Sequence, residues 1–505
     1  MDMRNQRGRG TQSGSSSGRV NGRYSDASSS RRQDYGGGSS SYDSGYGTRG
    51  FADRRNSSNS GGGYGARPSE RANSGFGAAR GVKKYNPLAP KKPAVAQARV
   101  VAAKDETGEI CFERMTGALE LHPNGYGFIR DPRASYVRQL TDPFLSSGVI
   151  DRLRLHDREG VEMVTRIRPR RGAVGPRVMT VEEVGGLDPR MYEKGLVPDF
   201  DELEPVTPCV RLSLVPDELP PGAPPLPMSM RIMDLLTPLG KGQRALIVAP
   251  PRSGKTVLLQ DMCQAMTTLH PEIKTIVLLI DERPEEVTDF RRSVADSVEV
   301  ISSSLDCELE SHIRVARFVT KRCKRLVEAG KDVFLLIDSI TRLARAFNKW
   351  VGNTGRTMTG GVDIQAMDIP KKIFSSARYV EKEDPEGGFK PAGSLTIVGT
   401  ALIDTGSRMD ELIFQEFKGT GNMELVLDRN LAERRVWPAI DLTKSGTRRE
   451  ERLLTEAERQ AANAMRRVMS DRRMSSVEAM EQMQAFFMKY DTNAELLARN
   501  FNSRF

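Results

Sequence analysis

Residues 245–266, ALIVAPPRSGKTVLLQDMCQAM, join an apolar run to a short turn and then to a stretch whose apolar residues recur on one helical face. In such a turn, backbone N–H groups and the positive end of the helix suit the phosphates of a nucleotide. A lysine there reaches the β and γ oxygens, and a threonine hydroxyl holds Mg²⁺. The predicted nucleotide-binding residues of this loop are Pro251, Arg252, Ser253, Gly254, Lys255 and Thr256.

One position departs from the usual motif, because Ala249 stands where its first glycine normally lies. The Gly-Lys-Thr tripeptide alone is equally consistent with a helix start that binds nothing. The apolar run before the turn and the amphipathic stretch after it favour the nucleotide site, since the loop needs both elements to aim its N–H groups.

Two further apolar runs end in carboxylates. KTIVLLIDE ends in Asp281 and Glu282, and DVFLLID ends in Asp338. Ligands of open α/β sheets bind at the carboxyl ends of the strands. Phosphoryl transfer to water needs one carboxylate near Mg²⁺ and another that orients and deprotonates the water. We predict that Asp338 has the first role and Glu282 the second, although each alone could be a solvated strand end or a helix cap.

The elements that must position these groups alternate between strand and helix. RALIVAP, KTIVLLID, DVFLLID and GSLTIVGTALID are continuous apolar runs separated by helical stretches, which predicts a parallel sheet covered on both faces. Before them, GALELH, GYGFIR, VEMVTRIR and RVMTVEEV alternate in polarity and are separated by turn residues. Short strands at that spacing predict a small antiparallel β-barrel of the OB-fold type.

Composition divides the 505 residues into four segments. Residues 1–80 contain 13 Arg, 17 Gly and 17 Ser but no Lys, Leu or Ile, and they carry most of the formal net charge of +10. Such a segment cannot bury enough apolar surface to offset the entropy of ordering its backbone. We therefore expect a disordered arm and linker over 1–105, an OB-fold domain over 106–186, a Pro-rich connector over 187–236 and an α/β P-loop ATPase domain over 237–505.

Other classes of site are not indicated. The five cysteines form no CxxC pair and the four histidines form no HExxH, so neither a disulfide framework nor a zinc site is predicted. The chain starts without an apolar leader, and no run approaches about 18 apolar residues. We expect a cytoplasmic protein.

The segment HPNGYGFIRDP places Tyr126, Phe128 and Arg130 at alternating positions, and hence on one face of a barrel strand. Aromatic rings beside an arginine form a platform on which single-stranded bases stack, as in other five-stranded barrels. A half-buried structural strand would have a similar pattern.

With these residues in hand, the chain from about 110 onward resembles the Rho family of transcription termination factors, which are hexameric RNA-dependent ATPases with a RecA-like motor. The strings APPRSGKT, LLIDERPEEV, DSITRLARA, TGGVD, ALIDTGSRMDE, FKGTGNMEL and SGTRRE carry the resemblance in order and spacing. It implies ATP with Mg²⁺, held by Thr256 and Asp338, and nascent single-stranded RNA as a partner. RNA polymerase and elongation factors are further implied partners.

The resemblance also assigns roles at the nucleotide site. Arg448 corresponds to an arginine finger that enters the neighbouring subunit's site, and Arg435 lies at the same intersubunit site. A planar guanidinium suits a transferring phosphoryl group. Trp437 replaces a phenylalanine that stacks on adenine, and Arg283 joins the nucleotide contacts. Without the resemblance, Arg448 would be interpreted as an exposed arginine near a helix start, and a core position is an open alternative for Trp437.

For RNA, the resemblance adds Asp142 and Phe144 to a pyrimidine pocket on the barrel. A Glu and a Tyr of the family are not matched in GAVGPRVM, which argues against a strict preference for cytosine. Two glycine-rich loops correspond to RNA contacts in a central channel, although flexible surface turns would look alike. Their residues are Arg356, Thr359, Gly360, Gly361, Thr405, Gly406 and Arg408.

Together these features predict an ATP-driven hexamer that translocates 5′ to 3′ along RNA, unwinds RNA–DNA hybrids and terminates transcription. The arginine-rich arm is expected to promote RNA binding and condensation. Two rivals are the catalytic subunit of a rotary ATP synthase and an RNA-condensing scaffold with weak ATPase activity. The aromatic barrel and the TGGVD loop argue against the first, and the full set of catalytic residue types argues against the second.

Overall fold

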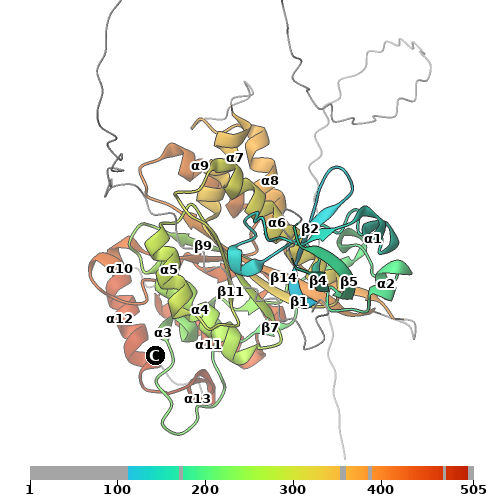
Figure 1. Ribbon diagram of the computed structural model, residues 1–505. Coiled ribbons are helices and arrows are strands. Elements are labelled where there is room, and N and C mark those ends of the chain that lie inside the picture. The colour runs from blue at the N-terminus through green and yellow to red at the C-terminus, as the bar shows by residue number, and fades with distance from the viewer. Residues whose placement is uncertain (1–111, 170–174, 353–359, 385–388, 470–473, 499–505) are drawn as a thin grey trace, which may run out of the picture. The chain divides into compact units, whose positions relative to one another are not determined.

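The computed structural model describes residues 112–169, 175–352, 360–384, 389–469 and 474–498. The N-terminal arm expected over 1–105 lies outside the described residues, as do Arg356 and Thr359 of the first glycine-rich loop. The described chain forms a small barrel followed by a larger α/β domain (Figure 1).

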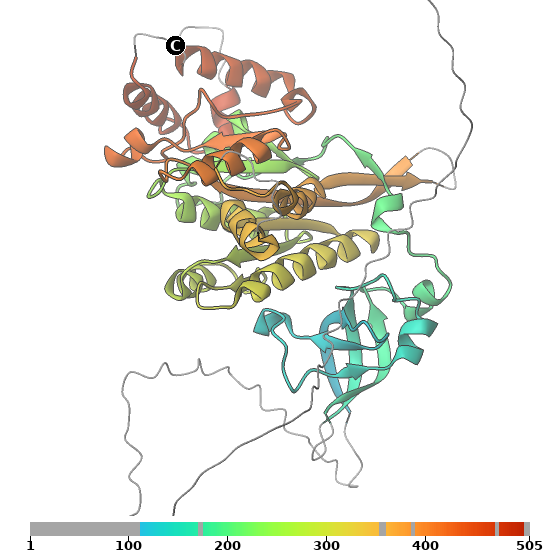
Figure 2. The same cartoon turned by 90° about the horizontal axis from the view of Figure 1, so that it is seen from above.

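The barrel is closed, with five strands in the order β1-β2-β3-β5-β4. Its strands are β1 (Glu113–Leu121), β2 (Gly127–Arg130), β3 (Phe144–Leu145), β4 (Glu162–Arg168) and β5 (Arg177–Val184). The pairing is antiparallel except between β3 and β5. Leu119, Ile129 and Met163 point inward because alternate residues of each strand are apolar. Figure 2 shows these strands, in cyan to green, curling into one unit that carries α1 (Ser147–Arg152). The expected small barrel is confirmed.

The α/β domain is built on a nine-stranded sheet whose main path runs β11-β10-β12-β14-β9-β15-β16. Its strands are β9 (Arg244–Ala249), β10 (Lys274–Ile280), β11 (Glu299–Ser303), β12 (Asp332–Asp338), β14 (Phe389–Leu402), β15 (Met423–Val426), β16 (Gly446–Thr447), and the antiparallel pair β6 (Glu204–Val206) and β13 (Arg378–Glu383). The six strands from β11 to β15 along this path are parallel. The sheet predicted from the apolar runs is therefore present.

Helices cover both faces of this sheet (Figure 1), which is why its strands are apolar on both sides. Along β9, Ile247 belongs to one core and Leu246 and Val248 to the other. The helices are α3 (Met228–Leu236), α4 (Lys255–Leu269), α5 (Pro284–Ser293), α6 (Leu309–Glu328), α7 (Ile340–Val351), α8 (Ile364–Ser375), α9 (Arg408–Lys418), α10 (Arg429–Glu433), α11 (Glu456–Met469), α12 (Ser476–Phe487) and α13 (Asn493–Ala498). The first core receives α3, α4, α11 and α12, and the second receives α6, α7 and α8.

The segment expected to be a connector, 187–236, contributes several elements to packing. It contains α2 (Pro189–Glu193), the 3₁₀ turn η2 (Phe200–Glu202) and β7 (Arg211–Leu212), which pairs with β8 (Leu239–Gly240). Its β6 extends the large sheet through β13, and the apolar residues of α3 lie in the core. The compact α/β domain thus begins before residue 237, because the Pro-rich stretch is followed at once by an amphipathic helix.

The barrel contacts α6 through buried polar groups. Arg158 donates to Glu328, whose carboxylate also accepts from the Phe200 N–H at 2.8 Å. Arg322, almost fully buried, pairs with Glu299 at 2.9 Å and with Glu162 of the barrel at 3.5 Å. Burial raises the pKa of Glu328 to about 7, although Arg325 and Arg158 oppose this shift. Because these charges are removed from water, the stability of the interface depends on each of them keeping its partners.

Among the residues that the structure describes, no helix combines the length and the apolar character needed to cross a membrane.

Candidate active site and nucleic-acid interface

The predicted phosphate-binding loop connects the end of β9 to the start of α4. Gly254 has a φ of 82° and Arg252 a φ of 64°, so the backbone makes the tight turn that brings successive N–H groups to one side. The Ser253 hydroxyl donates to the Pro250 carbonyl at 2.7 Å and closes the turn. Ala249 lies inside β9 and is fully buried, so its methyl group packs in the core. The tight turn therefore forms with alanine at that position.

Lys255 is brought to both predicted carboxylates. Its Nζ lies 2.5 Å from Asp338 Oδ1 and 3.6 Å from Glu282 Oε1. The Thr400 hydroxyl, from β14, donates to the same Asp338 oxygen at 2.7 Å. These groups meet because β10, β12 and β14 are neighbouring parallel strands that end at the same edge. The sequence-predicted cluster of Lys255, Glu282 and Asp338 is thus assembled at the carboxyl edge of the sheet.

Glu282 has the environment of a proton acceptor. It is 3 % exposed, and burial raises its pKa to about 7, with a further increase from the Asp338 charge. Lys255 and Arg342 act in the opposite direction. A carboxylate with a pKa near neutrality can both accept and release a proton at the pH of a cell.

Arg342 belongs to this site, but sequence reasoning missed it. Its Nη2 lies 3.3 Å from Glu282 Oε2, and its Nη1 donates to the Asp281 carbonyl. It is placed there by the first turn of α7, which Ser339 caps by accepting from the Arg342 N–H at 3.1 Å. A cation four residues after Asp338, at a helix start, is the signal that could have revealed it.

The residues expected to hold Mg²⁺ fit that ion. Mg²⁺ takes oxygen ligands, usually one or two from the protein with phosphates and water completing the shell. Thr256 begins α4 beside Lys255, and Asp338 presents a buried carboxylate at the same edge. In the described part of the chain, no group of three or more His, Cys, Asp or Glu side chains could hold a metal unaided. A cation here would therefore depend on the nucleotide.

Trp437 lies directly against the phosphate-binding loop. A Cβ atom on Gly254 would come within 2.7 Å of the indole Cζ3, so glycine is required both by its φ and by this contact. The indole is 41 % exposed, and Gln484 of α12 donates to the Trp437 carbonyl. An aromatic face is thus open to solvent beside the loop. The alternative of a core tryptophan does not fit this exposure.

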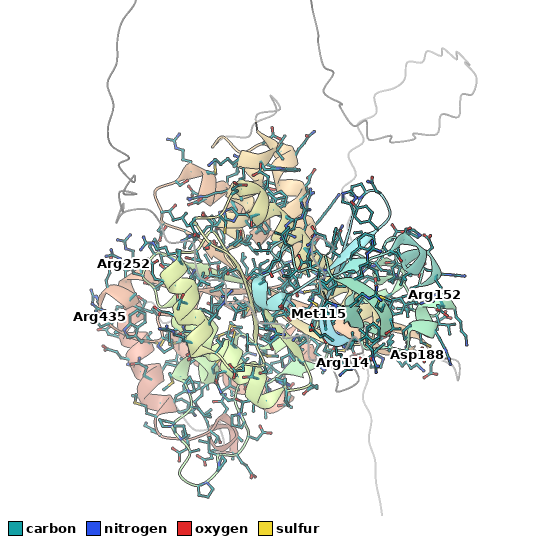
Figure 3. All side chains as sticks on the ribbon, in the orientation of Figure 1. Arg114, Met115, Arg152, Asp188, Arg252 and Arg435 are labelled. Atoms are coloured by element: carbon teal, nitrogen blue, oxygen red, sulfur yellow. The ribbon has the colours of Figure 1, made fainter. Side chains whose placement is uncertain are left out.

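The remaining predicted arginines of the nucleotide site are exposed. Arg283 precedes α5 and lies 3.9 Å from Glu286. Arg252 belongs to the phosphate-binding loop itself, and it lies on the same side of the molecule as Arg435 in Figure 3. Arg435 has a φ of 62° and follows α10, which continues from the carboxyl end of β15.

Arg448 lies elsewhere. Its N–H donates to the Asn422 carbonyl at 2.8 Å, and the Asn422 side chain accepts from the N–H of Arg244, the first residue of β9. A cavity of about 430 Å³ opens here, and Arg448, Arg449 and Arg466 are among its lining residues. Arg448 is therefore not brought together with Lys255 of the same chain.

The barrel carries a cluster of aromatic rings on its outer face. Tyr126, Phe128 and Phe144 are each half-buried, and their ring centroids lie 5.4 to 5.9 Å apart. Arg130 supports the cluster from below: it is 5 % exposed, lies 4.9 Å from the Phe128 centroid, and donates to Glu120 and Asp142. Asp142, also buried, accepts from the Gln139 N–H at 2.6 Å. Arg130 and Asp142 thus form the floor, and the rings form the surface.

Two further residues of this cluster were missed from the sequence. His122 stacks on Tyr126 with centroids 4.3 Å apart, and the exposed Arg177 lies 5.5 Å over the Phe144 ring. His122 is brought in by the turn between β1 and β2, where its N–H donates to the Tyr126 carbonyl at 2.7 Å, and Arg177 is brought in by the pairing of β3 with β5.

The described parts of the two glycine-rich loops lie together. A Cβ atom on Gly360 would come within 3.2 Å of the Arg408 carbonyl. The second loop is held by Asp410, which accepts from Thr405 at 2.6 Å and pairs with Arg345. Thr405, Gly406 and Arg408 are exposed. Exposed glycines beside a cation are suited to a phosphate chain.

Two protein-family models match the chain. Residues 115–190 match the RNA-binding domain of the Rho termination factor, and residues 229–447 match the nucleotide-binding domain of the ATP synthase alpha/beta family. These ranges contain the ring cluster and the Lys255–Glu282–Asp338 cluster, respectively.

Curated relatives match most of the chain. Transcription termination factor Rho of Aquifex aeolicus is 43% identical over 401 residues, which cover 79% of this chain and 87% of the relative. The protein of the same name from Chromobacterium violaceum is 45% identical over 368 residues, covering 73% of this chain and 83% of the relative. That from Cereibacter sphaeroides is 44% identical and covers 75% and 85%. The similarity therefore spans both folded domains.

Proposed function

The chain belongs to the Rho family of transcription termination factors, and on that premise we propose how its own residues divide the work. Members of this family are RNA-dependent ATPases that translocate along RNA. The observation that carries our assignment is the meeting of Lys255, Glu282 and Asp338 at one sheet edge, in a chain that also bears an aromatic barrel. We assign ATP hydrolysis to the first and RNA capture to the second.

For hydrolysis, Lys255 and the loop N–H groups bind the β and γ phosphates of ATP. Trp437 stacks on the adenine, with Arg252, Arg283 and Arg435 at the edge of the nucleotide. Mg²⁺, held by Thr256 and Asp338, supplies charge neutralisation on the phosphates when it is bound. Glu282 accepts a proton from the attacking water as the new P–O bond forms and the bond to the leaving ADP oxygen breaks. The proton then leaves Glu282 for solvent.

We further propose that the site is completed by a second copy of the chain in a hexameric ring. Arg448 lies at the amino end of β9, whereas the phosphate-binding loop follows its carboxyl end. A neighbouring subunit can bring its Arg448 to the γ phosphate, where a guanidinium stabilises the transferring group. Without that neighbour, each site lacks the guanidinium that stabilises the negative charge on the transferring phosphoryl group.

For RNA, the rings of Tyr126, Phe128 and Phe144 stack bases over the Arg130–Asp142 floor. The loops containing Gly360, Gly361, Thr405, Gly406 and Arg408, together with Arg356 and Thr359, then contact the backbone in the channel. Glycine lets backbone approach phosphates closely, and the arginines add charge. Nucleotide turnover at successive interfaces moves the hexamer 5′ to 3′ along the RNA and separates RNA–DNA hybrids.

The partners follow from this activity. Nascent RNA is bound as RNA polymerase releases it, so we propose RNA polymerase and its elongation factors as partners, and the cytoplasm as the place of action. The arm over 1–80 carries 13 arginines among glycines and serines. We propose that it binds RNA weakly at many points and promotes condensation. Its deletion should abolish droplets and lower RNA affinity at low salt while leaving RNA-saturated ATPase activity intact; unchanged droplets and affinity would refute this role.

ATP hydrolysis measured with and without single-stranded RNA tests the proposal. We expect RNA to increase the rate strongly, because members of this family are RNA-dependent ATPases. A rotary ATP synthase subunit, which shares the matched nucleotide-binding domain, would be indifferent to RNA. A scaffold with a weak ATPase would stay inactive in both conditions.

A further inference from the structure

Strand pairing lines up five residues across the outer face of the barrel. In β1, β2, β3, β5 and β4, in that order, directly opposed residues form one row: Glu120, Phe128, Phe144, Arg177 and Arg168. Neighbouring strands are about 4.8 Å apart, so the two arginines lie one and two strands beyond the Phe144 ring. The row thus passes from a carboxylate, over two aromatic rings, to a pair of cations.

The two cations at the end of the row differ from the other arginines in the barrel strands. Arg114 and Arg166 both donate to Glu182, and Arg130 is held by Glu120 and Asp142. Arg168 and Arg177 are both exposed, and neither pairs with a carboxylate anywhere in the described chain. The contact given for Arg177 is the face of the Phe144 ring, at 5.5 Å.

Like charges directly opposite each other in an antiparallel pair destabilise the sheet. Two guanidinium groups on one face, each with a fork of N–H donors, are complementary to the oxygens of a single phosphate. An anion bound between them would remove the repulsion. The folded barrel therefore keeps an arrangement that is unfavourable alone and favourable when a phosphate is present.

We propose that Arg168 and Arg177 form a phosphate site that grips the RNA backbone next to the base stacked on Phe144. The ligand is a phosphodiester of the same single strand, and the site sets the side of the barrel by which that strand leaves the rings. This inference rests on the proposed role of the barrel in RNA capture, and it adds a backbone contact that the rings alone do not supply.

The test uses the full chain without nucleotide and a short labelled oligoribocytidylate, with binding followed by fluorescence anisotropy across a salt series. Arg168→Gln combined with Arg177→Gln should weaken binding on the order of tenfold. The slope of log affinity against log salt should fall by about 0.7 for one lost phosphate contact. Arg190→Gln combined with Lys194→Gln removes two exposed cations at α2, away from the row, and is the control for the same change in net charge.

A second probe isolates the phosphate. One linkage of the oligonucleotide is replaced by a neutral methylphosphonate after a 2′-deoxynucleotide, with an ordinary linkage after the same 2′-deoxynucleotide as the control. At one position the neutral linkage should weaken binding to the unmodified protein but not to the double variant. If the neutral linkage weakens binding equally for both proteins at every position, the proposal is overturned. The arginines would then act only through the Phe144 ring and not on a phosphate.

Melting of the RNA-free protein separates a binding role from a structural one. We expect the double variant to melt at the same temperature as the unmodified protein or higher, because like charges have been removed. A lower melting temperature with an unchanged salt slope would overturn the proposal. Phe128→Ala distinguishes failure of the phosphate site from failure of the proposed role of the barrel in RNA capture. If Phe128→Ala also leaves RNA binding unchanged, RNA capture occurs elsewhere.

Discussion

Arg448 and Lys255 lie beyond opposite ends of the same strand, β9. Arg448 is joined through Asn422 to Arg244, where the strand begins, and Lys255 follows Ala249, where it ends. At about 3.3 Å per residue, the strand alone separates them by about 17 Å. Within one chain, the guanidinium of Arg448 therefore lies far from Lys255, which supports the proposal that a second copy supplies this arginine to the phosphates.

Mixing inactive subunits into native rings tests this consequence. Rings assembled from native and Arg448→Ala chains should lose ATPase activity faster than the native fraction falls, because each variant disables a neighbour whose own site is intact. Activity is measured against the mixing ratio after exchange between subunits is complete. A strictly linear decrease in fully assembled rings would contradict action across an interface.

The roles of Glu282 and Lys255 separate under substitution. Glu282→Gln keeps the shape of the side chain but removes the charge that accepts the proton, so ATP should bind and remain unhydrolysed. Lys255→Ala should lose nucleotide affinity as well as rate. Filter binding of labelled ATP, with single-turnover hydrolysis, distinguishes the two effects. Native turnover by Glu282→Gln would move the catalytic role to another carboxylate, such as Asp281.

The pH dependence of hydrolysis should report Glu282. Because its pKa is raised to about 7 and the ionised form is required, kcat/KM for ATP should rise with pH up to about 7 and then level off. The positive charge of Arg342 lowers this pKa, so Arg342→Gln should move the rise to higher pH. A profile that is flat from about pH 5.5 to about pH 8 would contradict the assignment.

RNA capture should depend on the rings rather than on the phosphate-binding loop. Replacing Tyr126 and Phe128 by Ala should cost about 1 to 3 kcal/mol of binding free energy per stacked base. Assembly of the hexamer and basal ATPase activity should persist, because both residues belong to the barrel and lie outside the ATPase domain. Normal RNA binding by the double variant at fixed salt would mean that this face is structural.

Much of the motor could be predicted from the sequence. Continuous apolar runs leave few alternatives to buried parallel strands, and they correspond to β9, β10, β12 and β14. Carboxylates at the ends of such strands meet because parallel strands share an edge. The local pattern therefore contained enough information to bring Lys255, Glu282 and Asp338 together.

Features set by distant pairing were not predictable in the same way. β3 has only two residues, and β6 forms an edge strand through its contact with β13, far along the chain. The position of Arg177 over Phe144 likewise depends on the parallel pairing of β3 with β5. Arg130 was expected beside the rings, and its burial beneath them follows from Glu120 and Asp142, which arrive from other segments.

The buried ion pairs between the barrel and α6 also limit how the gene can recombine. A barrel without Arg158 and Glu162 would remove one partner each from Glu328 and Arg322, which within the described chain would keep only Arg325 and Glu299, respectively, as ion-pair partners. A chimera that preserves every one of these pairs therefore inherits α6 together with the barrel, even though about 125 residues of sequence separate α6 from the end of β5. The segment exchanged without loss of these pairs is defined by contacts in space. It includes α6 and therefore does not end at the boundary between the two domains.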